Sequence, residues 1–137
     1  MLVTKTAEYA IRAVTILATN QSADCMSSAA LSKLGSIPPS YLSKILQQLV
    51  AAELLSTQKG PNGGYRIDKP LKKIKILHVL EAVDICLDIT HCPFGFDNCG
   101  GAEPCPVHAS YQHVKKTYYK WAATTTLADL ASASQKP

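Results

Sequence analysis

The sequence predicts a mainly α-helical fold with one small β-hairpin, in the form of a winged helix-turn-helix followed by a C-terminal dimerisation helix. Three patterns lead to this prediction. Apolar residues recur at helical spacing along most of the chain. A short predicted helix is joined by a tight turn to a longer one, and a glycine-rich tip then separates two short strand-like runs. With 137 residues, 47% of them apolar, the chain suffices for one domain, or for a small domain with an appendage.

The first helix is predicted from a single apolar stripe, which stops before Asn20-Gln21-Ser22. Polar residues, among them Glu8 and Arg12, lie on the opposite side of this helix. The pattern is that of a helix with one face in the core. The stripe consists of Val3, Ala7, Ala10, Ile11, Val14, Leu17 and Ala18.

The next two predicted helices form a helix-turn-helix. Ser27 is expected to cap the first of them and Gly35 to follow its last turn as the C′ residue. Pro39 suits the first position of the second helix, which we expect over about 40–53. By composition alone, a plain helical hairpin fits these residues equally well. The second helix has an inward apolar face with Leu42, Ile45, Leu46 and Leu49.

A predicted β-hairpin follows the second helix and favours a winged helix over a plain hairpin of helices. Residues 54–58 and 65–67 read as its strands, and 59–64 form a tip rich in turn residues. In a winged helix such a tip contacts the DNA backbone or the minor groove. The wing residues expected to do so are Lys59, Asn62 and Arg66.

The outward face of the presumed recognition helix is expected to contact DNA. Glutamine can read adenine, and serine or tyrosine can hold phosphate. Residues 1–80 carry a balance of +6 and the remainder −2, which suits contact between the N-terminal half and phosphate. The alternative is an ordinary solvated helix face. The predicted contacts on this helix are Ser40, Tyr41, Lys44, Gln47 and Gln48.

We divide the chain into a winged-helix DNA-binding domain at 1–70 and a second part at 71–137. The second part starts with a connecting helix at about 74–87 and continues with a cysteine-rich loop at about 88–106. Thr126 and Asp129 form a variant capping box that opens a short last helix. Between loop and last helix, a seam with 4-3-4-3-4 spacing indicates a dimerisation helix packed across a two-fold axis. The seam consists of Val107, Tyr111, Val114, Tyr118, Trp121 and Thr125.

Three cysteines lie in the predicted loop. Cys92, Cys99 and Cys105 have the spacing Cys-x6-Cys-x5-Cys, and His108 follows three residues after the last. These gaps are longer than the two to four residues typical of zinc sites, whereas iron–sulfur clusters accept more varied spacings. We therefore favour an iron–sulfur cluster, with zinc and a thiol-only redox role as the alternatives. The remaining cysteines, Cys25 and Cys86, are expected to be bystanders.

Other classes of protein are disfavoured. The chain has no run of about 18 apolar residues and no signal-peptide pattern, so we expect a cytoplasmic protein without a membrane partner. It also shows no nucleophile elbow and no nucleotide-binding loop, so we expect no enzyme activity. A cluster carrier or redox protein without DNA binding is the remaining rival.

With these parts identified, the chain resembles the IscR/NsrR family of bacterial winged-helix repressors over residues 1 to about 131. The resemblance lies in 7–13 of the first helix, 41–46 of the recognition helix, Lys-Gly-Pro-Asn-Gly-Gly-Tyr at 59–65, the three cysteines, and 126–130. It implies a homodimer that binds a palindromic double-stranded promoter site. It also implies an iron–sulfur cluster, held by the three cysteines, that controls DNA affinity in response to iron–sulfur status, redox state or nitric oxide.

The resemblance leaves two candidates for the fourth ligand. His108 matches the IscR pattern, in which this histidine completes a [2Fe–2S] site. Glu8 stands where the NsrR branch has an acidic residue in the first helix, which ligates a [4Fe–4S] cluster of the other subunit. This chain has both residues. We favour [2Fe–2S], with [4Fe–4S] as the alternative.

Overall fold

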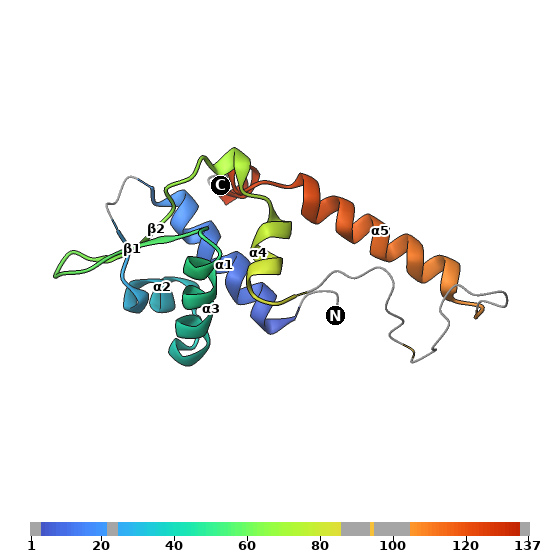
Figure 1. Cartoon of the computed structure of the whole chain (residues 1–137), viewed down its shortest axis with the longest axis horizontal. Coiled ribbons are helices and arrows are strands. Elements are labelled where there is room, and N and C mark those ends of the chain that lie inside the picture. Colours follow the sequence, from blue (N-terminus) through green and yellow to red (C-terminus); the bar gives the residue numbers. More distant parts are fainter. Residues whose placement is uncertain (1–3, 22–24, 86–93, 95–104, 135–137) are drawn as a thin grey trace.

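The structure is a computed structural model that describes residues 4–21, 25–85, 94 and 105–134. In these ranges it contains helices and one two-stranded antiparallel hairpin, so the predicted fold class is confirmed (Figure 1). The elements in chain order are α1 (Lys5–Thr19), α2 (Ser28–Gly35), α3 (Pro39–Ala51), β1 (Ser56–Gln58), β2 (Gly64–Arg66), the 3₁₀ turn η1 (Leu71–Lys73), α4 (Ile76–Ala82), α5 (His108–Thr124) and α6 (Leu127–Ser134).

The helix starts follow the capping residues in the sequence. The hydroxyl of Ser27 accepts an N–H of α2 at 3.1 Å, as predicted, and the hydroxyl of Thr4 does the same for α1 at 3.2 Å. Pro39 is the first residue of α3. At α6 the N–H of Thr126 donates to the Asp129 carboxylate at 2.9 Å, and the N–H of Asp129 donates to the Thr126 hydroxyl at 3.2 Å. The variant capping box is therefore confirmed.

Gly35 has a different role from the predicted one. It is the last residue of α2 and not the C′ residue, and Ser36 takes the left-handed conformation with φ 51°. A Cβ at position 35 would lie 2.9 Å from the side chain of Ile37 and 3.0 Å from that of Ile16. The glycine is thus needed for the close approach of the helix-turn-helix to α1, and not for its own backbone conformation.

Two predicted helices are shorter in the structure. α3 ends at Ala51, two residues before the predicted end, because Glu53 takes a left-handed conformation with φ 62°. α4 covers Ile76–Ala82 instead of 74–87, and Asp84 also has φ 62°. The N–H of Ile85 donates to the carbonyl of Leu80 at 2.9 Å, which closes the end of α4 in the manner of a Schellman motif.

The main core lies between α1, α2, α3, α4 and α6. α1 contacts each of the other four helices, and its buried residues include Ala10, Ala13 and Val14. A second, smaller cluster joins α1, α4 and α5 through Ala7, Leu80 and Ala122. Within the described ranges Ala122 is the single buried residue of α5. α5 extends away from the body on the side opposite to the wing (Figure 1).

The wing is tied to the segment before α2. β1 pairs with β2 in the register Ser56–Arg66 and Gln58–Gly64. Beyond this hairpin, Met26 and Tyr65 exchange backbone hydrogen bonds of 3.0 and 2.8 Å. Gly64, next to this pair, has φ 151°, and a Cβ there would overlap the carbonyl of Met26. The position of the wing on the body therefore depends on this glycine.

No helix in the part of the chain that the structure describes is long and apolar enough to cross a membrane.

We predict that Gly64→Ala lowers the free energy of unfolding by about 1–3 kcal/mol more than Gly60→Ala, as expected for overpacking. Both glycines have positive φ, 151° and 112°, so both substitutions bring backbone strain, but a Cβ at position 60 meets no atom within 4 Å. Urea unfolding of the two variants measures the difference. Equal losses would show that the Met26 contact is unimportant.

Candidate nucleic-acid interface

α3, the predicted recognition helix, presents a polar face because its apolar face is in the core. Leu42, Ile45, Leu46 and Leu49 are each 0–1% exposed. Their spacing leaves the intervening positions outside, since a helix repeats every 3.6 residues. The structure exposes four of the five predicted contacts and leaves the fifth partly buried: Ser40, Tyr41, Lys44 and Gln47 are exposed, and Gln48 is intermediate.

Tyr41 is held at the start of α3 by an aromatic contact to α1. Its ring centroid lies 5.6 Å from that of Tyr9 in an edge-to-face arrangement with an interplanar angle of 63°. The guanidinium carbon of Arg12 lies 5.5 Å from the centre of the Tyr9 ring. These ring contacts fix the position of the Tyr41 side chain on α3. Tyr41 nevertheless remains 51% exposed.

Arg12 joins α1 to the turn of the helix-turn-helix. Its Nη1 donates to the carbonyl of Gly35 at 2.8 Å, and its Nη2 lies 3.4 Å from Oε1 of Glu8. The i,i+4 spacing of Glu8 and Arg12 indicates their pairing from sequence. The contact with Gly35 spans 23 residues, and no sequence pattern indicates it.

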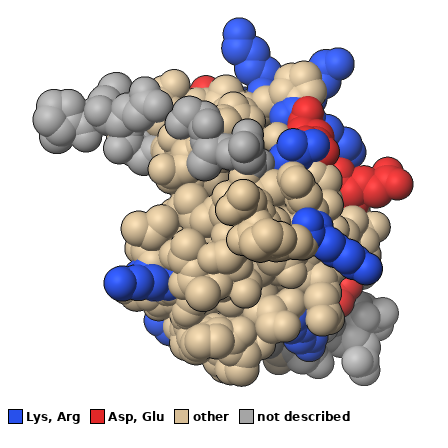
Figure 2. Space-filling model, turned by 90° about the vertical axis from the view of Figure 1, so that its left-hand side faces the viewer, with Lys and Arg blue, Asp and Glu red and all other residues tan. Residues whose placement is uncertain are grey.

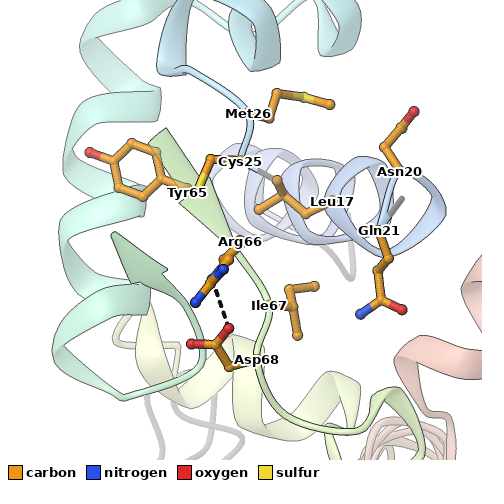
Figure 3. Close-up of a pocket in the computed structure, with 9 residues that line it drawn as sticks. All are labelled: Leu17, Asn20, Gln21, Cys25, Met26, Tyr65, Arg66, Ile67 and Asp68. Carbon is orange, nitrogen blue, oxygen red and sulfur yellow. Dashed lines mark ion pairs between the residues drawn. The ribbon is translucent and has the colours of Figure 1, made fainter. Parts of the chain in front are cut away.

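The predicted wing residues occupy two environments. Lys59 and Asn62 lie exposed in the tip between β1 and β2. Arg66 lies at the base, where its Nε is 2.9 Å from Oδ1 of Asp68, with the two side chains 51% and 53% exposed (Figure 3). The carboxylate of Asp68 therefore offsets part of the charge that Arg66 would offer to phosphate.

A cavity of about 260 Å³ lies beside the base of the wing, between the end of α1, residues 25–26 and β2 (Figure 3). Cys25 lines it, and its thiol donates to the side-chain carbonyl of Gln58 at 3.5 Å. The Asp68 carboxylate also lines it and is paired with Arg66. That Cys25 is a bystander stays a prediction.

A second cavity, of about 530 Å³, lies between the start of α1, the outward side of α3 and the end of α4. Tyr41, Lys44 and Gln48 line it from α3, and Asp84 lines it from the segment after α4. Across it, Nε2 of Gln48 donates to Oδ2 of Asp84 at 2.9 Å. No sequence pattern indicates Asp84, because its partner Gln48 lies 36 positions away in the chain.

Most of the predicted cluster-binding loop lies outside the described residues, including Cys92 and Cys99, as does Cys86. Cys105, half-buried, lies three residues before His108, which is the first residue of α5. The N–H of His108 donates to the carbonyl of Cys105 at 3.0 Å, so the two residues share one tight turn. A thiolate and an imidazole fit iron–sulfur ligation chemically. Within the described ranges no three His, Cys, Asp or Glu residues are grouped to hold a metal ion.

Glu8 has one oxygen without a hydrogen bond. Its Oε1 faces Arg12, while Oε2 lies 3.6 Å from the ammonium of Lys5, which is ion-pair distance but too long for a hydrogen bond. Among the described atoms this Oε2 is buried and accepts no hydrogen bond. A carboxylate oxygen in this state can chemically accept a hydrogen bond or coordinate a metal ion.

Comparison with known proteins places these features in context. The family model Rrf2, described as an iron-dependent transcriptional regulator, matches residues 3–133. The transcriptional regulator IscR of Escherichia coli is 30% identical over 132 residues, which cover 96% of this chain and 81% of that protein.

Two solved structures share the fold. CymR, described as the global cysteine regulator of B. subtilis, superposes with a TM-score of 0.80 at 18% identity and covers 96% of each chain. IscR of T. potens superposes with a TM-score of 0.75 at 20% identity, over 97% of this chain and 88% of that one. Each likeness extends over at least 96% of this chain and concerns the fold alone.

We predict that Arg12→Met destabilises the protein by about 1–3 kcal/mol, because it leaves the partly buried carbonyl of Gly35 without this donor. Methionine keeps most of the apolar body of arginine. The matched control is Arg66→Met, which breaks an exposed ion pair and should cost less than about 1 kcal/mol. Thermal or urea unfolding distinguishes the two. If Arg66→Met proved the more damaging, the role assigned to Arg12 would be wrong.

Proposed function

Since this chain belongs to the Rrf2 family of transcription regulators, we propose that it is a homodimeric repressor whose affinity for a palindromic promoter site is controlled by an iron–sulfur cluster. Family membership confirms the predicted resemblance, and members of the family are DNA-binding regulators and not enzymes. The observation that carries the proposal is the exposed polar face of α3 beside an exposed, glycine-rich wing tip.

In this proposal α3 enters the major groove and the wing contacts the DNA backbone. Gln47, exposed at the middle of the outward face, reads a base edge, for which adenine suits a glutamine amide. The remaining contacts are to phosphate and carry no sequence information. We assign phosphate contacts to Ser40, Tyr41 and Lys44 on α3 and to Lys59, Asn62 and Arg66 on the wing.

The distribution of charge supports this orientation. The face of the molecule on the wing side has lysine and arginine side chains around its rim, with acidic side chains among them at the upper right, and an area without charged side chains at its centre (Figure 2). Basic groups at the edge of a contact surface can neutralise the phosphates on either side of a groove. Uncharged side chains can then meet the base edges between them.

The dimer in this proposal forms through α5. Val107, Val114 and Trp121, all members of the predicted seam, are 40–45% exposed although they are large and apolar. Ala122 anchors α5 on the body. Tyr118 belongs to the predicted seam but also packs against the body, and burial raises the pKa of its phenol. A helix anchored in this way, with Val107, Val114 and Trp121 exposed, suits packing against a second copy across a two-fold axis.

The proposed cluster ligands are Cys92, Cys99 and Cys105, with His108 as the favoured fourth ligand and Glu8 of the other subunit as the alternative. A bound cluster would supply a redox-active group, whose oxidation would change its charge and whose loss would release the ligating side chains. The two candidates for the fourth ligand lie on different elements. His108 opens α5, the proposed dimerisation helix, whereas Glu8 contacts Arg12 and through it the turn before α3. His108 would therefore transmit a signal through the dimer, and Glu8 through the recognition unit.

A zinc-bound or thiol-based DNA-binding protein is the second candidate. It is supported by the fold that this chain shares with CymR, a protein described as a cysteine regulator. A cluster carrier without DNA binding has no support from the family. Metal content separates the remaining candidates.

We predict that Lys44→Gln weakens binding to all DNA sequences alike and lowers the salt dependence of binding by about one unit of slope per subunit, because one phosphate contact is lost. Gel-shift or anisotropy titrations at several salt concentrations measure this slope. Lys120→Gln, on exposed α5 away from the wing, is the control and should leave the slope unchanged. A change of sequence preference in Lys44→Gln would contradict a phosphate role.

We predict that protein purified without oxygen contains about two iron and two sulfide per chain, and that His108→Ala loses them while Glu8→Gln and Cys25→Ser do not. Iron and acid-labile sulfide assays with an absorption spectrum measure this. About four of each, with the loss in Glu8→Gln instead, would identify the alternative ligand. Zinc, or no metal, would contradict cluster binding. Unchanged promoter affinity of Cys105→Ala against the metal-loaded protein would contradict control by the cluster.

A further inference from the structure

Asp84 adopts a backbone conformation that most residues avoid. It follows α4 with φ 62°, in the left-handed region where glycine or asparagine is usual at the end of a helix. Two backbone bonds hold it there: its own N–H donates to Glu81 at 3.1 Å, and that of Ile85 donates to Leu80 at 2.9 Å. A glycine would fit this position without strain. Aspartate tolerates this conformation better than most residues do, and unlike glycine it adds a side chain that can make a contact.

The side chain of Asp84 contacts the recognition helix. Its Oδ2 accepts a hydrogen bond of 2.9 Å from Nε2 of Gln48, two turns along α3 from Tyr41. Tyr41, Lys44 and Gln48 form one row on α3, which lines the 530 Å³ cavity toward α1 and α4. Gln47 does not line this cavity and is exposed. The two adjacent glutamines therefore face different surroundings.

We propose that Asp84 and Gln48 form a tether that positions the recognition helix, and that Gln48 is a positioning residue while Gln47 reads the base. The inference rests on the proposed function, since it assigns a role within DNA binding. The tether links α3 to the residue at which the chain leaves α4, eight positions before Cys92 in the sequence. The amide of Gln48, with one N–H committed to Asp84, sets the angle at which the second half of α3 meets DNA.

The test combines DNA binding with a measurement that needs no DNA, on the full chain as purified without oxygen. The variants are Gln48→Ala, Asp84→Gly, the double variant, and Asp84→Asn. Asp84→Gly removes the carboxylate while it suits the left-handed backbone, so loss of folding is not the expected outcome. Asp84→Asn keeps an acceptor and tolerates the same conformation. Gln47→Ala is the matched control on the neighbouring residue.

We expect Gln48→Ala and Asp84→Gly each to lower promoter affinity by about two- to tenfold, the range for one hydrogen bond. The double variant should lose no more than either single one. Asp84→Asn should stay near the wild type. Across a set of promoters with single base changes, these variants should keep the wild-type order of preference, whereas Gln47→Ala should lose discrimination at one position.

The inference is overturned if Gln48→Ala changes base preference as Gln47→Ala does, or if the losses of Gln48→Ala and Asp84→Gly multiply in the double variant. Hydrogen exchange in the free protein tests, without DNA, whether the bond between Asp84 and Gln48 restrains α3. Asp84→Gly should speed exchange of the amides in the second half of α3, and unchanged exchange would overturn the tether. If the wild type shows no sequence-dependent DNA binding in any metal state, the proposed function fails, and the exchange result still tests the tether.

Discussion

The close packing of α1 is the constraint on which the rest of this structure depends. Ala7, Ala10 and Ala13, spaced three apart, are 0–1% exposed, and their small side chains allow neighbouring helices to approach the α1 backbone. α2, α3, α4 and α6 all contact this helix. Gly35 completes the arrangement by leaving room for Ile16 of α1. A larger side chain at position 10 or 13 would disturb the main core that holds α3, and one at position 7 would disturb the contact with α4 and α5.

The polar side of the same helix reaches the candidate interface. Tyr9 supports Tyr41 at the start of α3, and Arg12 bonds the carbonyl of Gly35 in the turn before it. At the other end of its outward row, α3 is bonded to Asp84 through Gln48. The apolar face of α3 is thus held by burial in the core, and its polar face and its start are held by directional contacts. Burial alone would permit sliding and rotation, which directional contacts oppose.

The long helix α5 buries less of its surface than the other long helices of the molecule do. It has a single buried residue among the described ones, Ala122, and carries exposed Val114 and Trp121. In a monomer these side chains would remain in water, at a cost of about 25 cal/mol for each Å² of apolar surface left uncovered. The proposed dimer removes this cost. It would also place the turn with Cys105 and His108, at the start of α5, near the partner chain.

The sequence by itself determined the elements and their order, because these depend on local patterns. Apolar spacing located α1, α3 and α5, Ser27 and the Thr126–Asp129 pair marked helix starts, and glycines marked the wing. Exposure of the polar face of α3 followed from the same periodicity. The resemblance to the IscR/NsrR family rested on short motifs and was confirmed by the family match. The cluster ligands Cys92 and Cys99 fall outside the described residues and stay a prediction.

Only the tertiary structure decided which side chains meet across the chain. The reach of Arg12 to Gly35, the stack of Tyr9 on Tyr41 and the bond from Gln48 to Asp84 join residues 23 to 36 positions apart, where no periodicity operates. It also decided that α4 stops at Ala82 and that Gly35 serves packing and not the helix end. Helix ends depend on a few backbone bonds whose strength is comparable to that of the neighbouring contacts, so the packing around them selects the final residue.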